Sequence, residues 1–127
     1  MALKASGSPP KVEMASADPL QDYYQRGGNL YSVARIVDEA KDLTPFDVPV
    51  ASLDVSGVPF DELSLLEMAW HCRKVVDADL RYPIILDWDG CVADGRHRIV
   101  RALMDGRKTI KAVRLQHQMT PCSVEDE

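Results

Sequence analysis

Residues 83–93 constrain the fold of this chain more than any other stretch of its sequence. Pro83–Trp88 is a mainly apolar run typical of a strand, and Asp89-Gly90 directly after it is a favoured two-residue reversal. Cys91–Ala93 then returns as the partner of the first strand. This pattern predicts a β-hairpin, around which the rest of the chain has to pack.

A helix and a strand are expected after the hairpin. Asp94-Gly95 interrupts the returning strand, and residues 96–105 carry an apolar face at helical spacing, formed by Ile99, Ala102 and Leu103. Gly106 can end this helix. Residues 109–115 supply a further strand, and its facing stays open because both of its sides are mixed.

Two more helices and a short strand are expected before the hairpin. Asn29 can cap a first helix that ends near Leu43, and residues 48–53 indicate a strand in which Pro49 marks an edge or a strand start. Asp61 precedes a second helix, whose apolar stripe consists of Leu65, Leu66, Ala69, Cys72 and Val76. The order of elements predicts a compact α+β fold, in which helices pack on a small mixed sheet that contains the hairpin.

The composition indicates one domain with a polar segment at each end. A chain of 127 residues, 46% of them hydrophobic, can build one modest core. Residues 1–28 are expected to form a flexible arm, which the aromatic pair Tyr23 and Tyr24 can pin to the surface. Residues 29–115 are expected to form the folded domain, and residues 116–127 a flexible acidic tail.

The chain shows no sequence signal for export or membrane insertion. No run approaches the roughly 20 apolar residues of a membrane-spanning helix, and the N-terminus lacks the apolar core of a signal peptide. Cys72, Cys91 and Cys122 are too widely spaced for a disulfide framework or a Cys-x-x-Cys metal site. We therefore expect a cytoplasmic protein with reduced thiols and no membrane partner.

Positive charge is concentrated near the hairpin. Seven of the 15 Lys and Arg residues lie between Asp94 and Arg114 with only two acids, so this segment carries +5 within a net charge of −5 and leaves −10 elsewhere. An acidic body repels nucleic acid, whereas a local basic cluster can hold an anion at short range. The pattern favours a phosphorylated small ligand, with any DNA binding weak and sensitive to salt.

The turn at residues 94–98 is the candidate site. Gly95 permits a positive φ and a close ligand approach, and the first amides of the following helix are donors at the positive end of its dipole. Side chains of the same helix add donors for an anion: Arg96, His97, Arg98 and, one turn later, Arg101. A simple turn followed by a solvated arginine face explains the same spacing, so the spacing alone leaves both interpretations open.

The sequence from Val48 to Leu115 resembles the ParB/sulfiredoxin superfamily, most closely in the Asp-Gly-x-His-Arg turn. Gly95 and Arg98 match the Gly-x-x-Arg phosphate motif of that superfamily, and Ala102 matches the small residue that follows it. The resemblance implies a domain that binds a nucleoside triphosphate with magnesium, in bacterial plasmid or chromosome partition or a related DNA-associated process. Arg96 departs from the pattern, because ParB proteins usually carry an acid there.

The resemblance leaves the activity open. Sulfiredoxins have their catalytic cysteine just before the His-Arg pair, where this chain has Arg96, so sulfinic acid reduction is not expected. Too few residues follow Leu115 for a helix-turn-helix reader or a dimerisation domain, so we expect a stand-alone domain, which can still be a homodimer. Four possibilities stay open. Three are enzymatic: nucleotide hydrolysis, phosphoryl transfer with His97 as the candidate catalytic residue, and nucleic-acid cleavage. The fourth is a non-catalytic interaction module that has lost its ligand.

A rival interpretation rests on residues 84–92, which resemble the first motif of haloacid-dehalogenase-type phosphatases. In that motif the first aspartate, here Asp87, is the nucleophile and the second, Asp89, is the acid or base. Only 37 residues follow Gly90, too few for the rest of that fold, so a hairpin turn explains the run better. The aspartates here do not match a calcium loop either, and no metal site is predicted.

Overall fold

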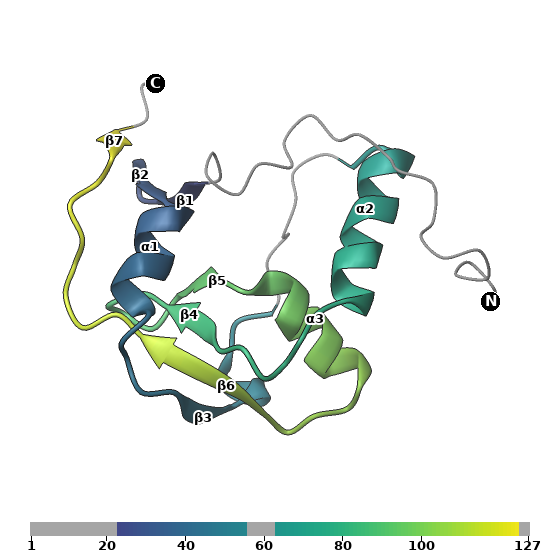
Figure 1. Ribbon diagram of the computed structural model, residues 1–127. Coiled ribbons are helices and arrows are strands. Elements are labelled where there is room, and N and C mark those ends of the chain that lie inside the picture. The colour runs from purple at the N-terminus through teal and green to yellow at the C-terminus, as the bar shows by residue number, and fades with distance from the viewer. Residues whose placement is uncertain (1–22, 56–62, 125–127) are drawn as a thin grey trace.

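The computed structural model describes residues 23–55 and 63–124 (Figure 1). Its elements are short strands and short helices. In chain order they are β1 (Tyr23–Arg26), β2 (Asn29–Ser32), α1 (Val33–Ala40), β3 (Phe46–Pro49), the 3-10 helix η2 (Val50–Ser52), α2 (Leu65–Val76), β4 (Ile84–Leu86), β5 (Val92–Asp94), α3 (Arg96–Met104), β6 (Thr109–Arg114) and β7 (Ser123–Val124).

A four-stranded mixed sheet forms the centre of the fold. Its strand order is β3-β6-β4-β5, with β4 parallel to β6 and the other two pairings antiparallel. The predicted hairpin is confirmed as β4 and β5, but its strands are shorter than expected and residues 87–91 connect them in place of a two-residue reversal at Asp89-Gly90. Pro49 lies on the edge strand β3 as expected. The chain therefore has the α+β fold that the sequence predicts.

Helices α1 and α3 cover opposite faces of this sheet. Successive residues of a strand point to opposite faces, and those of β4 and β6 divide between two buried clusters. The cluster on the α1 side contains Tyr24, Tyr31, Ile36, Ala40, Ile85, Ala93, Val113, Leu115 and Met119. The cluster on the α3 side contains Val48, Val50, Ile84, Leu86, Ile99, Ala102, Ile110 and Ala112. Strand β6 thus contributes to both clusters, with Ile110 and Ala112 on the α3 side and Val113 on the α1 side.

The N-terminal part of the domain differs from the expected helix at Asn29. Residues Asn29–Ser32 form β2, which pairs with β1, and helix α1 begins only at Val33. Gly27 and Gly28 have φ values of 58° and 85°, so they supply the two positive φ angles of a tight hairpin turn. This turn geometry prevailed over the helical spacing of the apolar residues, and the expected start of the helix was wrong.

Strands also lie on either side of residues 29–115. Tyr24 in β1 is buried, in keeping with the expectation that this aromatic pair pins the N-terminal arm. Met119 is buried as well, and Ser123–Val124 pairs with β2 to complete a second sheet of order β1-β2-β7. Residues 1–22 and 125–127 lie outside the described residues.

Helix α2 begins and packs differently from the prediction. Ser64 caps it in a reciprocal capping box with Glu67, and Asp61, the expected start, lies outside the described residues. Val75 is its buried residue, whereas every member of the expected stripe is exposed: Leu65, Leu66, Ala69, Cys72 and Val76. The helix packs on α3 through a different side, so the stripe does not belong to the described core. The expected strand at 48–53 is likewise shorter, because η2 begins at Val50.

Gly95 allows the start of α3 to pack directly against the central strand β4. Its φ is 109°, and a Cβ atom placed there would lie 2.6 Å from Ile84 Cγ2 and 2.8 Å from Ile84 Cβ. Both the backbone angle and the close packing therefore require glycine. The position is buried, so Gly95 acts as a packing contact between α3 and β4.

The carboxylate of Asp87 joins the hairpin to β1. The residue is 0% exposed, and its Oδ1 accepts hydrogen bonds from the amides of Asp89 and Cys91, each at 2.9 Å. Its Oδ2 accepts from Tyr24 Oη and Arg26 Nη1, also at 2.9 Å. Burial by itself would raise the pKa of Asp87, but these donors and the Arg26 charge outweigh it and hold the pKa below its ordinary value.

The substitution Asp87→Asn is expected to lower the free energy of unfolding by about 3–5 kcal/mol near neutral pH. Asparagine keeps the size of the side chain but turns N–H donors toward Tyr24 and Arg26, leaving the guanidinium without its buried partner. Urea unfolding followed by tryptophan fluorescence measures the change. Asp42→Asn, at an exposed carboxylate, is the control and is expected to shift stability by no more than about 0.5 kcal/mol.

The difference in stability between the wild type and Asp87→Asn should also depend on pH. Because the folded-state pKa of Asp87 is lowered, its contribution is present above the unfolded pKa of about 3.9 and is lost as the pH falls through the folded value. The stability difference between the wild type and D87N should therefore shrink below about pH 4. A difference that persists unchanged to about pH 2 would contradict this role.

Candidate functional site

The residues predicted to bind an anion do not converge on one point in the structure. Arg96 is exposed and lines a groove on one side of α3, whereas Arg101 lines a separate hollow on the side that faces the end of α2. Gly95 is buried against β4 and lines neither of them. The arrangement expected from the sequence, with all of these residues around a polyphosphate, is not present.

Arg98 has a structural role. Its Nη1 donates to the carbonyl oxygen of Pro83 at 2.9 Å, and its Nη2 forms an ion pair with Asp94 at 3.0 Å. These contacts tie the first turn of α3 to the segment that enters β4 and to the end of β5. The guanidinium is therefore engaged within the protein.

Arg101 links α3 to the last turn of α2. Its Nη1 donates to the carbonyl oxygen of Val76, and its Nε pairs with Asp105 at 3.0 Å. A cation at the negative end of the α2 dipole stabilises that end of the helix. The side chain thus acts as a cap for α2.

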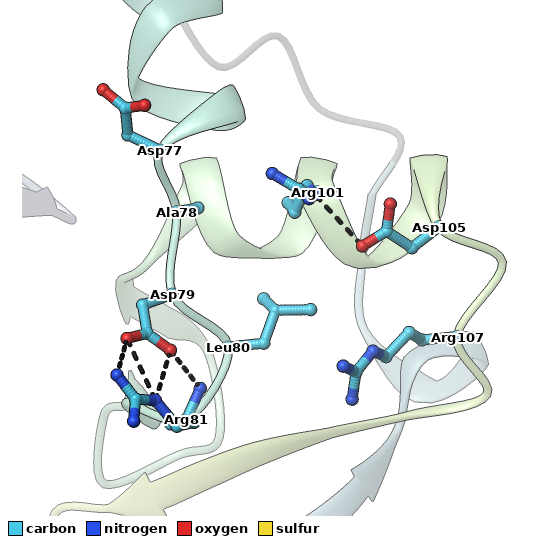
Figure 2. Close-up of a pocket in the computed structure, with 8 residues that line it drawn as sticks. All are labelled: Asp77, Ala78, Asp79, Leu80, Arg81, Arg101, Asp105 and Arg107. Carbon is cyan, nitrogen blue, oxygen red and sulfur yellow. Dashed lines mark hydrogen bonds and ion pairs between the residues drawn. The ribbon is translucent and has the colours of Figure 1, made fainter.

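The hollow beside Arg101 has a volume of about 390 Å³ and balanced charges. Figure 2 shows two ion pairs around it, Arg101 with Asp105 and Arg81 with Asp79, with Leu80 between them. Arg107 also lines the hollow, and its side chain has no hydrogen bond or ion pair with any residue that the structure describes. Arg81 and Arg101 each form an ion pair with an aspartate. The hollow therefore has no concentration of positive charge that would attract an anion.

His97 contacts α2. Its Nε2 lies 2.8 Å from Nδ1 of His71 in a hydrogen bond, and its ring meets Trp70 edge-on. Burial, followed by the nearby positive charges of His71 and Lys74, lowers the pKa of His97 to about 4. The ring is therefore neutral at pH 7 and joins the two helices. No sequence pattern links His71 with His97, so this pairing could not be predicted.

A groove of about 560 Å³ lies between α3, the hairpin turn, β1 and the segment after η2. Its α3 wall is one helical face with an arginine at its start, formed by Arg96, Ile99, Val100 and Leu103. The opposite walls include Gln25, Arg26, Leu53, Asp54, Cys91 and Val92. The volume is that of an ordinary small-molecule site, with mainly apolar walls and a few polar groups.

Arg96 is the chemically distinctive residue of this groove. Its guanidinium forms no hydrogen bond or ion pair with the described parts of the chain, 23–55 and 63–124. Gly95 provides no side-chain cap, and no acidic residue stands in the first turn of α3, so the positive end of the helix dipole is not neutralised from within that turn. Of the predicted residues, Arg96 is the one that the structure leaves available to an anion in a groove.

Arg26 is a groove residue that the sequence analysis missed, because it was assigned to the flexible arm. Its Nη1 lies 2.9 Å from Asp87 Oδ2 and 2.7 Å from Asp89 Oδ2, and these carboxylates raise its pKa further above its ordinary value. The Arg26-Gly27-Gly28 turn was the available signal, since it folds β1 back onto β2. Arg26 therefore borders the groove with its charge already compensated.

The environment of Asp87 argues against the phosphatase mechanism. A carboxylate nucleophile has to reach the phosphorus of its substrate, but this carboxylate is fully enclosed and accepts four hydrogen bonds. Asp87 and Asp89 fold the hairpin loop.

Metal-binding clusters and membrane-spanning helices are absent from the part of the chain that the structure describes. Within it, no three His, Cys, Asp or Glu side chains lie close enough together to hold a metal ion. No helix there is both long and apolar enough to cross a lipid bilayer. The three cysteines are exposed and free.

No protein-family model matches the chain, and the curated proteins and the solved structures likewise contain no significant match to it.

The two neighbouring arginines are expected to respond differently to truncation. Arg98→Ala removes the donor to Pro83 and the partner of Asp94, so it should lower the free energy of unfolding by about 1–3 kcal/mol. Arg96→Ala should change stability by no more than about 0.5 kcal/mol. Thermal and urea unfolding of both variants test this, and equal losses would contradict the assignment of separate roles.

Proposed function

We propose that this protein contains a ParB/sulfiredoxin-like domain that binds a nucleotide or another phosphorylated small molecule in the groove along α3. Arg96 holds the phosphate, and the apolar face of Ile99, Val100 and Leu103 receives the body of the ligand. The observation that carries the proposal is the guanidinium of Arg96, which lines a groove of about 560 Å³ and has no hydrogen bond or ion pair with residues 23–55 and 63–124.

The order of elements supports this proposal. Strand β3, helix α2, the hairpin β4–β5, helix α3 and strand β6 occupy the stretch whose sequence resembles the superfamily. The positive end of the α3 dipole adds to the Arg96 charge where the phosphate is placed. Gly95 and Arg98 act indirectly in this scheme, because they hold the start of α3 against β4.

The charge distribution separates this proposal from a DNA-binding role. The chain carries a net charge of −5, and several of the basic side chains near the hairpin already have partners: Arg98, Arg101, Lys111 and Arg114. A duplex needs a row of available cations along its phosphates. We therefore propose that the chain binds a small ligand in the groove more strongly than it binds DNA.

A non-catalytic interaction module is the second candidate, and helix α2 favours it. Leu65 is 88% exposed and Val76 is 63% exposed, with Leu66 and Met68 also exposed on this helix. Exposed apolar residues grouped on one element are typical of protein contact surfaces. Both functions can coexist, because the α2 stripe and the groove involve different residues.

Calorimetric titration tests the proposed function. The ligands to titrate are nucleoside mono-, di- and triphosphates, with and without magnesium. We expect at least one of them to bind, and its affinity should fall ten- to a hundred-fold in Arg96→Ala, because one charge-assisted contact contributes about 1.5–3 kcal/mol. Arg107→Ala is the matched control, because it removes another exposed arginine without a described partner, from the other hollow.

The proposal fails if every nucleotide binds weakly and R96A binds like the wild type. It also fails if R107A lowers the affinity as much as R96A does, because the effect would then come from general charge and not from the groove.

A further inference from the structure

Building on the proposed function, we infer that Arg26 determines which base the groove accepts, and that it selects guanine over adenine. Arg26 is the last residue of β1 and lines the groove on a wall opposite α3. In this arrangement Arg26 holds the base of a nucleotide while Arg96 holds the phosphate. The inference rests on the part of the Arg26 guanidinium that is not engaged within the protein.

The guanidinium of Arg26 uses one of its nitrogen atoms for its contacts with carboxylates. Nη1 lies 2.9 Å from Asp87 Oδ2 and 2.7 Å from Asp89 Oδ2, so each of its two N–H groups has an acceptor. Nε and Nη2 form no hydrogen bond or ion pair with residues 23–55 and 63–124. Since 35% of this side chain is exposed, a ligand in the groove can reach these donors.

The corresponding two nitrogen atoms of another arginine make a two-point contact in this chain. Nε and Nη2 of Arg81 donate to both carboxylate oxygens of Asp79, at distances between 2.7 and 3.1 Å. These two nitrogens lie on one edge of the planar guanidinium, which therefore fits two neighbouring acceptor atoms. In Arg26 the same edge is available to two adjacent acceptors of a ligand.

The carboxylates beside Arg26 favour uncharged acceptors at this edge. Asp87 is fully buried, and together with Asp89 it compensates the charge of the guanidinium. An anion brought to Arg26 would also approach both carboxylates, and like charges repel at short range. Neutral acceptors avoid this repulsion and still use the N–H donors. We therefore place the phosphate at Arg96 and an uncharged part of the ligand at Arg26.

Guanine is the purine that presents two adjacent neutral acceptors. Its O6 and N7 atoms accept a two-point hydrogen bond from an arginine, whereas adenine presents N7 beside the N–H donors at N6. An adenine placed against Arg26 would bring donor against donor and leave a polar group of each without a partner. Val100 and Leu103 on the α3 wall can cover the flat face of either purine, so the preference comes from Arg26.

Calorimetric titration of the full chain with four purine nucleotides tests the contact in the unaltered protein. Guanosine monophosphate has both acceptors, and inosine monophosphate keeps O6 and N7 but lacks the 2-amino group. Adenosine monophosphate has a donor in place of O6, and 7-deazaguanosine monophosphate lacks N7. The first two nucleotides should bind about tenfold more tightly than the last two.

The variant Arg26→Lys tests whether the preference comes from this side chain. Lysine keeps a cation beside Asp87 and Asp89 but has no planar edge with two donors. R26K should therefore bind guanosine monophosphate about as weakly as the wild type binds adenosine monophosphate. Arg107→Lys, the same change in the other hollow, is the control and should keep the preference for guanine. Thermal unfolding of both variants checks that they are folded.

The outcomes distinguish the inference from the proposed function. The inference is overturned if adenosine monophosphate or the 7-deaza analogue binds as tightly as guanosine monophosphate. It is also overturned if folded R26K keeps the preference, or if R107K loses it. In each of these cases the proposed function stands as long as R96A weakens nucleotide binding. If R96A binds every nucleotide like the wild type, the proposed function itself is lost.

Discussion

The buried carboxylate of Asp87 is the interaction on which the arrangement of the candidate site depends. It holds the hairpin loop through two backbone amides and holds β1 through Tyr24 and Arg26. β1 and the hairpin loop are far apart in the sequence, and both border the groove beside α3. Breaking this carboxylate's contacts with β1 would therefore open one side of the groove as well as destabilise the fold. An enclosed charge of this kind is stable only while all of its partners are present.

The second constraint is the close packing of α3 on β4, because it gives the arginines of α3 different surroundings. With Gly95 against Ile84, Arg98 reaches the carbonyl of Pro83 and Arg101 reaches the end of α2. Arg96 follows Gly95 directly and lines the groove. Two of the arginines of α3 thus make contacts within the protein, whereas Arg96 lines the groove without a hydrogen bond or ion pair to any residue that the structure describes.

The sequence predicted the elements whose ends are specified locally. The turn at Asp89-Gly90, the glycine at 95 and the glycine at 106 delimit the hairpin and α3, and these elements formed near their expected positions. The first helix was misplaced because Gly27 and Gly28 make a hairpin turn that outweighs the helical spacing after Asn29. Arg96 is a site residue that the turn predicts, and the structure places it on the wall of a groove. The engagement of Arg98 and Arg101 could not be predicted, because their acceptors, Pro83 and Val76, lie 15 and 25 residues away.

Chemical-shift mapping of the backbone amides is the most direct test of where a ligand binds. In the ¹⁵N-labelled protein, titration with nucleoside monophosphates should shift the amides of Arg96 and Val100 on α3 together with those of Leu53 and Cys91 on the facing walls, since all four residues line one groove. Shifts confined to Asp77–Arg81 and Arg107 would place the ligand in the other hollow and contradict the assignment of the groove.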